Sequence, residues 1–231
     1  MSASALALVV TIGILPAFGV TMLVIDLLAK RIPALDVWVV DRAALIYLMF
    51  TVAGVVVAWG VGLIPMSALW KKMNWGLPLA LLLVPAAAIV PYFIELALSA
   101  ASRGNAPSLG AGIFLRDAEP AVGALLDRPL VWWSVAVGTA LTEEFLFRGA
   151  VLHAVLSDTR PLLAILASAV VFGLHHVAFG INAIIGKILA GLLWGGLVLL
   201  AGTVFASITA HLLFQCLVWR RYRKVRAQRA W

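Results

Sequence analysis

Charged residues are scarce in this chain. Only 12% of its 231 residues are Asp, Glu, Lys or Arg, whereas 64% are hydrophobic, and the mean hydropathy is +1.10. A soluble globular domain is about 25% charged and about 45–50% apolar. A water-soluble fold of this length cannot hide so much apolar surface. The composition therefore excludes a soluble domain and requires a bilayer as the solvent.

Cysteine is almost absent, since Cys216 is the single thiol. One cysteine cannot form an intramolecular disulfide, and it cannot supply a cysteine cluster for a metal ion. Cys216 lies in an apolar stretch, where a free thiol usually behaves as a small hydrophobe. We therefore assign it no chemistry.

Apolar runs of about 20 residues, the length that crosses a bilayer, fill most of the chain. They predict an all-α, polytopic membrane bundle of about seven transmembrane helices, at 5–27, 43–64, 77–99, 130–155, 161–179, 183–200 and 204–219. We expect residues 1–99 to form a three-helix scaffold, 100–129 a loop, 130–219 a second helical region and 220–231 a basic tail.

Basic residues outnumber acidic ones, and the formal net charge is +7. Cytoplasmic loops of membrane proteins carry an excess of Lys and Arg. Seven spans with a cytoplasmic C-terminus leave twelve basic residues inside and three outside. The charge thus indicates topology rather than nucleic-acid binding. It predicts a multi-pass protein with its N-terminus outside and its C-terminus inside. We expect the membrane to be a prokaryotic plasma membrane, an expectation that does not follow from the charge.

Ionisable groups inside the predicted spans need an explanation, because burying them in hydrocarbon costs several kcal/mol each. Residues 161–186 and 188–219 contain no Asp, Glu, Lys or Arg. Against that background a few polar residues stand out in the fourth, fifth and seventh spans: Glu143, Glu144, Arg148, His175, His176, His211 and Gln215. The first three spans carry no comparable cluster.

The fourth span contains two adjacent carboxylates. Glu144 and Arg148 are four residues apart, so they share one face of a helix and can form an ion pair. Glu143 lies about 100° around the helix and lacks that partner. Such a pair of environments prepares one carboxylate as a general base. The alternative is an ion pair that only locks helices together, but a structural pair needs one glutamate, not two.

The fifth and seventh spans place histidines in similar four-residue patterns. Phe172 shares a helix face with His176, and His211 shares one with Gln215. A lone histidine on an apolar face is more often a satisfied core residue. Polar positions on three helices of so apolar a chain instead indicate a shared interior site.

These motifs together resemble a known family. In this order on successive spans, Glu143-Glu144-x-x-x-Arg148, Phe172-x-x-x-His176 and His211-x-x-x-Gln215 are similar to those of the CPBP family. That family contains CAAX prenyl endopeptidases and bacteriocin-processing enzymes and is also called Abi. The resemblance covers about 140–220. Its third motif usually ends in Asn or Asp, where this chain has Gln215.

The resemblance implies an intramembrane endopeptidase of the glutamate type, with its catalytic helices in 130–219. The substrate would be a membrane-associated or lipid-anchored protein or peptide. Glu143 would be the general base, and His176 would orient the attacking water. Glu144 and Arg148 would be the supporting pair, while His211 and Gln215 would stabilise the oxyanion.

A metal cofactor is a further question, because members of this family have been described both as metalloproteases and as glutamate-type proteases. Glu143, His176 and His211 form a possible zinc set with water in the fourth position. The chain lacks the His-Glu-x-x-His spacing that makes a zinc assignment strong. We therefore expect no metal and no other cofactor.

Two other functions stay open from the sequence. One is a non-catalytic membrane scaffold or immunity factor with the same fold, which the departure at Gln215 favours. The other is a proton-coupled transporter, in which the glutamates and histidines form a relay. Transporters of that kind are built from repeats with broken helices, and we find no repeat in this sequence.

Overall fold

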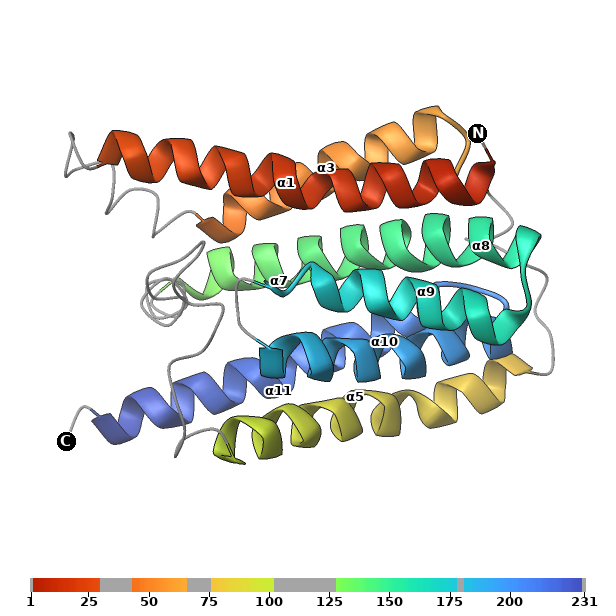
Figure 1. Cartoon of the computed structure of the whole chain (residues 1–231). Coiled ribbons are helices and arrows are strands. Elements are labelled where there is room, and N and C mark those ends of the chain that lie inside the picture. The colour runs from red at the N-terminus through yellow and green to blue at the C-terminus, as the bar shows by residue number, and fades with distance from the viewer. Residues whose placement is uncertain (1, 30–42, 66–75, 102–127, 178–180, 230–231) are drawn as a thin grey trace.

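The computed structural model describes residues 2–29, 43–65, 76–101, 128–177 and 181–229 (Figure 1). These residues are almost entirely helical and contain no strand, which confirms the all-α prediction. In chain order the elements are α1 (Ala3–Ala29), α3 (Ala43–Gly60), α5 (Gly76–Ala101), α7 (Pro129–Glu144), the π-helix η2 (Phe145–Leu152), α8 (His153–Asp158), α9 (Pro161–Leu174), α10 (Ile181–Ala201) and α11 (Phe205–Arg229).

Three stretches of the described chain are long and apolar enough to cross a membrane: Gly76–Leu98, Pro129–Asp158 and Ile181–Ala201. Shorter apolar helices occupy Ala3–Phe18, Ala44–Gly60 and Pro161–Leu174. The last helix, α11, extends beyond its apolar part and continues through the basic residues to Arg229. Most of the expected loop at 100–129 lies outside the described residues.

The fourth predicted span is one continuous helix of 30 residues, made of α7, η2 and α8. It begins at Pro129, and proline suits the first helical position because its missing N–H has no intrahelical partner there. Its middle is a π-helix, a feature found frequently at functional sites. Side chains bond two carbonyls of the widened turns: Ser168 Oγ lies 2.7 Å from Phe147 O, and His153 Nδ1 lies 2.7 Å from Arg148 O.

This central helix is enclosed by the others (Figure 1). On one side α1 and α3 pack against each other and against α7 and η2. On the other side α9 packs against η2, while α11 packs against α7. Helix α10 contacts α9 and α11, and α5 closes the bundle behind α10 and α11.

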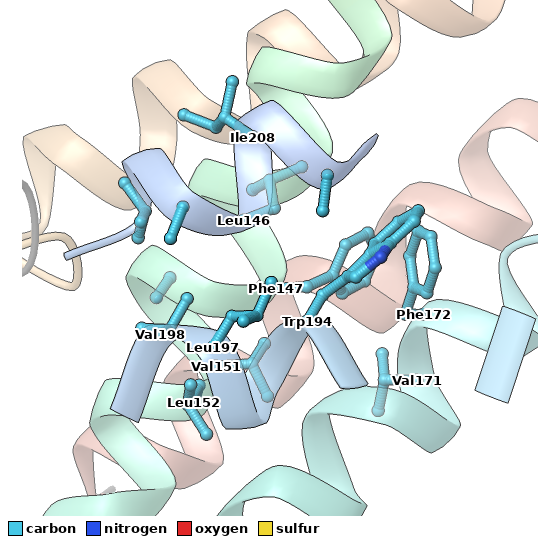
Figure 2. Packing of buried hydrophobic residues seen from close by; sticks show 14 of the residues in the cluster. Leu146, Phe147, Val151, Leu152, Val171, Phe172, Trp194, Leu197, Val198 and Ile208 are labelled. Atoms are coloured by element: carbon cyan, nitrogen blue, oxygen red, sulfur yellow. The ribbon is translucent and has the colours of Figure 1, made fainter. Parts of the chain in front are cut away.

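The apolar core forms around the π-helix (Figure 2). Phe147 of η2, Phe172 of α9 and Trp194 of α10 are fully buried there. The Trp194 Nε1–H donates to Ala87 O of α5 over 2.9 Å, so the buried indole nitrogen has a partner. A polar group with a partner can be buried at little cost. This core therefore surrounds the segment that carries the ionisable residues.

Candidate active site

The centre of the candidate site is an ionic cluster formed by residues of α7, η2 and α11. Arg148 Nη1 lies 3.0 Å from Glu144 Oε1, which confirms the ion pair predicted from their spacing. His211 Nδ1 lies 3.0 Å from the same carboxylate oxygen. All three side chains are buried, with at most 2% exposed. Glu144 is therefore held between two basic groups.

Glu143 has different neighbours. The Tyr47 hydroxyl of α3 donates to its Oε1 over 2.9 Å, and His211 Nε2 lies 3.7 Å from its Oε2. The side chain is 4% exposed. The two adjacent glutamates thus share His211, but only Glu144 also has the guanidinium.

Aromatic rings enclose the ionic cluster. The Arg148 guanidinium carbon lies 4.5 Å from the Phe172 ring centroid and 5.4 Å from that of Trp194. Trp194 stacks on His211 at 4.4 Å with an interplanar angle of 29°. Figure 2 shows Trp194 and Phe172 side by side at this position. Cations are attracted to aromatic faces most strongly where water is excluded.

A glycine makes room for the guanidinium. A Cβ at Gly191 of α10 would lie 2.8 Å from the Ala169 Cα and 3.3 Å from Arg148 Nη2. The first distance is one that real Cβ atoms almost never show. The absence of a side chain at this position thus allows α9 and α10 to approach closely above Arg148.

The paired histidines of the fifth span take different positions. His175 Nε2 lies 2.8 Å from Thr11 O of α1, and its Nδ1 lies 3.4 Å from the Tyr47 hydroxyl. His176 Nδ1 lies 3.0 Å from Phe172 O, and the two rings meet edge-on at 5.0 Å. His175 therefore joins the site through Tyr47, and His176 joins it through Phe172.

Gln215 lies one helical turn beyond His211. Its Nε2 is 3.5 Å from His211 Nε2. An imidazole that donates from Nδ1 to Glu144 has a lone pair on Nε2, which can accept a hydrogen bond from the carboxamide. The Gln215 amide and the Glu143 carboxylate thus both lie near Nε2 of His211.

The structure brings together the residues that the sequence singled out, and it adds two. Glu143, Glu144, Arg148, His211 and Gln215 are linked by direct side-chain contacts, and His176 lies against the same aromatic ring as Arg148. Sequence reasoning missed Tyr47 and Trp194. Neither residue is charged, so neither stands out by composition in an apolar span. The contact of Tyr47 with Glu143 depends on how the helices pack.

The sequence offered Glu143, His176 and His211 as a possible zinc set. Zinc sites in enzymes use three protein ligands at about 2.0–2.3 Å from the metal. Among the described residues, no three His, Cys, Asp or Glu side chains converge to hold a metal. His211 also directs Nδ1 at Glu144, so only Nε2 remains on the side of Glu143.

Comparison with known proteins points the same way as the motifs. Residues 126–217 match the family model described as type II CAAX prenyl endopeptidase Rce1-like. No curated protein and no solved structure matches the chain. The matched segment contains all six site residues predicted from the sequence, whereas Tyr47 lies outside it. The match over residues 126–217 supports an assignment of this integral membrane protein to the CAAX-type protease family that the motifs resemble.

Proposed function

We propose that this protein hydrolyses a peptide bond of a membrane-associated or lipid-anchored protein or peptide, with a water molecule activated by Glu143. The observation that carries this proposal is the unequal pairing of two adjacent buried carboxylates. Glu144 is bound by Arg148 and His211, while Glu143 meets a neutral hydroxyl and the far nitrogen of His211. A carboxylate without a permanent cation can exchange a proton, as a general base must.

The remaining residues have roles that follow from their contacts. Glu144 accepts the His211 Nδ1–H and so orients the imidazole, much as the acid of a serine-protease triad orients its histidine. The same carboxylate stabilises His211 when it is protonated. In protonated His211, Nε2–H and the Gln215 amide, whose nitrogens lie 3.5 Å apart, are two donors that can turn to an oxyanion bound beside them.

His176 would orient the attacking water, as the family resemblance implies. Its Nδ1–H donates to Phe172 O, which fixes the tautomer in which Nε2 is the acceptor nitrogen. An acceptor nitrogen can bind one hydrogen of the water molecule and so direct its oxygen at the carbonyl carbon of the substrate. Its position against Phe172 keeps His176 beside the ionic cluster.

The reaction then balances in two steps. The water oxygen attacks the carbonyl carbon, one water proton passes to Glu143, and the carbonyl oxygen becomes an oxyanion bound by His211 and Gln215. When the intermediate collapses, the C–N bond breaks and Glu143 gives its proton to the leaving nitrogen. Removing one oxyanion donor typically costs about 10²–10³ in kcat.

The test is a comparison of peptide termini in the membrane proteome of cells with the wild-type protein and with the Glu143→Gln variant. Glutamine keeps the shape of the side chain but cannot take a proton. We expect new termini that depend on wild-type protein and vanish in the variant at equal expression. Asp158→Asn is the matched control, because it removes an exposed carboxylate from the end of the same long helix. Termini that persist in the Glu143→Gln variant would contradict the proposal.

The same experiment separates the other functions. A scaffold or immunity factor retains its partner and its phenotype in the Glu143→Gln variant, since the change is mild. A proton-coupled transporter loses transport and changes no termini. Neither alternative is favoured by a contact in the described residues.

Metal independence and topology belong to the same proposal. We expect cleavage by purified protein to continue in the presence of a chelator. Loss of cleavage that added zinc restores would contradict this expectation.

The topology has its N-terminus outside and its C-terminus inside a prokaryotic plasma membrane. Proteolytic removal of a C-terminal tag in inside-out vesicles, with protection in intact spheroplasts, is the expected result.

A further inference from the structure

We propose that Tyr47 and His175 are positioning residues that keep the Glu143 carboxyl hydrogen-bonded both before and after it takes the proton from water. This inference rests on the proposed function and adds to it two residues outside the family's motifs. Tyr47 also lies outside the matched segment, on α3. The N-terminal helices would then be part of the active site as well as its scaffold.

The basis is a chain of hydrogen bonds that joins four helices. The Tyr47 hydroxyl of α3 lies 2.9 Å from Glu143 Oε1 of α7 and 3.4 Å from Nδ1 of His175, which follows α9. Nε2 of the same histidine lies 2.8 Å from Thr11 O of α1. Tyr47 therefore links the base to His175 in the part of the protein that the structure describes, and the far end of this hydrogen-bond chain is fixed to a backbone carbonyl.

The backbone contact determines which nitrogen of His175 carries the hydrogen. A carbonyl oxygen only accepts, so Nε2 must donate to Thr11 O. In the neutral ring Nδ1 is then an acceptor. His175 is 5% exposed and packs edge-on against Phe147 at 4.8 Å, which keeps this orientation.

The hydroxyl of Tyr47 thus faces two acceptors but has one hydrogen to donate. While Glu143 is ionised, the hydrogen points to its carboxylate, which is the nearer and more strongly accepting partner. Once Glu143 has taken the proton from water, the protonated carboxyl can donate to the tyrosine oxygen. The tyrosine hydrogen then turns to His175 Nδ1. No O–H bond of Tyr47 breaks in this change.

This arrangement matters because a buried group that loses its partner destabilises the state in which it stands alone. Because the Tyr47 hydroxyl can hydrogen-bond Glu143 in both its ionised and its protonated form, neither form of Glu143 loses its partner. The ring itself is held independently of the hydroxyl, since Phe18 meets it edge-on at 5.5 Å. Replacement of Tyr47 by phenylalanine should therefore keep the packing and remove only the hydrogen bonds.

The first test is steady-state cleavage by purified Tyr47→Phe protein in proteoliposomes. The substrate is a peptide carrying the cut site found by terminus mapping. We expect kcat to fall roughly ten- to a hundredfold, the value of a hydrogen bond to a charged group, with KM within about twofold. Tyr92→Phe on α5 is the matched control and should leave both constants unchanged. Equal kcat in the Tyr47→Phe and wild-type proteins would overturn the proposal, and so would a rise in KM alone.

The second test uses His175 and keeps the proposal falsifiable if one variant folds poorly. Asparagine places an acceptor oxygen near the position of Nδ1, whereas leucine places none. We expect His175→Asn to retain more of the wild-type kcat than His175→Leu does. We also expect the Tyr47→Phe change to have little further effect in the His175→Leu background. Additive losses would mean that the two residues act separately and would overturn the proposal.

A third measurement needs no substrate. Infrared difference spectra of wild-type and Glu143→Gln protein identify the carboxyl band of Glu143. We expect this band to shift in the Tyr47→Phe protein, because the carboxyl loses a hydrogen bond, and to stay in place in Tyr92→Phe. An unshifted band would overturn this inference alone. If instead no termini depend on Glu143 while the band shifts, the proposed function fails and the hydrogen-bond chain stands.

Discussion

Helix α5 and the central helix of α7, η2 and α8 are both long and apolar enough to cross a membrane, yet they relate to lipid in opposite ways. In the apolar 18-residue stretch of α5, only 28% is buried inside the bundle, compared with 56% in the corresponding stretch of the central helix. Helix α5 presents large apolar side chains outward, and Leu82 is 78% exposed. The central helix instead encloses Glu143, Glu144 and Arg148, which are almost completely buried.

The difference explains how this protein tolerates ionisable groups. Charged side chains within a membrane usually face the bundle interior and pair with one another. Here Glu144 and Arg148 pair within the central helix. The surrounding helices supply the further partners: His211 from α11, Tyr47 from α3 and the aromatic rings from α9 and α10. Helix α5 thus presents apolar side chains outward, whereas the central helix carries the buried ionisable groups.

The largest effect on stability should come from Arg148→Met. The change leaves the Glu144 carboxylate buried without its guanidinium, and breaking a buried ion pair typically costs about 3–5 kcal/mol. The measurement is unfolding in mixed micelles followed by tryptophan fluorescence. The double variant Arg148→Met/Glu144→Gln should recover part of the loss, because no charge is then left unpaired. A single variant as stable as wild type would contradict the buried pairing.

A smaller loss is expected from Gly191→Ala, which tests the close approach of α9 and α10. The new Cβ would meet the Ala169 backbone, so the helices must separate, and overpacking typically costs about 1–3 kcal/mol. Gly196→Ala on the same helix is the control, since no atom lies within 4 Å of its Cβ. Equal unfolding free energies for the two alanine variants would show that the space above Arg148 is not restricted.

Trp194→Phe should lower stability by about 1 kcal/mol, because the Ala87 carbonyl loses its donor while most of the ring packing remains. The exposed Trp59→Phe change on α3 is the control and should have no effect on the same unfolding curve. A neutral Trp194→Phe result would mean that the indole hydrogen bond does not stabilise the link between α10 and α5.

Leu82→Ala on α5 should have the smallest effect. Surface substitutions away from special features usually change stability by less than about 0.5 kcal/mol. The same unfolding measurement applies. A loss as large as that of Trp194→Phe would mean that Leu82 packs against protein, and the contrast between the two helices would no longer hold.

Much of the fold could be predicted from the sequence, because hydropathy reports the helices directly. The expected span at 130–155 corresponds to the helix Pro129–Asp158, and the one at 183–200 corresponds to Ile181–Ala201. The π-helix could not be predicted, since widening a turn leaves no mark on the apolar pattern. Helix α11 also continues beyond the expected span at 204–219 to Arg229, because hydropathy indicates the apolar span and not where the helix ends.

The site was predictable where its contacts are local. Glu144 with Arg148 and His211 with Gln215 are pairs four residues apart, and both appear as contacts in the structure. Contacts between distant segments gave no such signal. Tyr47 meets Glu143 across 96 positions of sequence, and only the packing of α3 on α7 brings them together.

The central claim is that Glu143 activates water within this buried cluster. The most direct test is cleavage by reconstituted wild-type protein in water enriched in heavy oxygen, with Glu143→Gln as the comparison. We expect the new C-terminal carboxylate of the product to carry one heavy oxygen atom and the variant to form no product. A wild-type product without the label, or the same labelled product from the Glu143→Gln protein, would contradict the account.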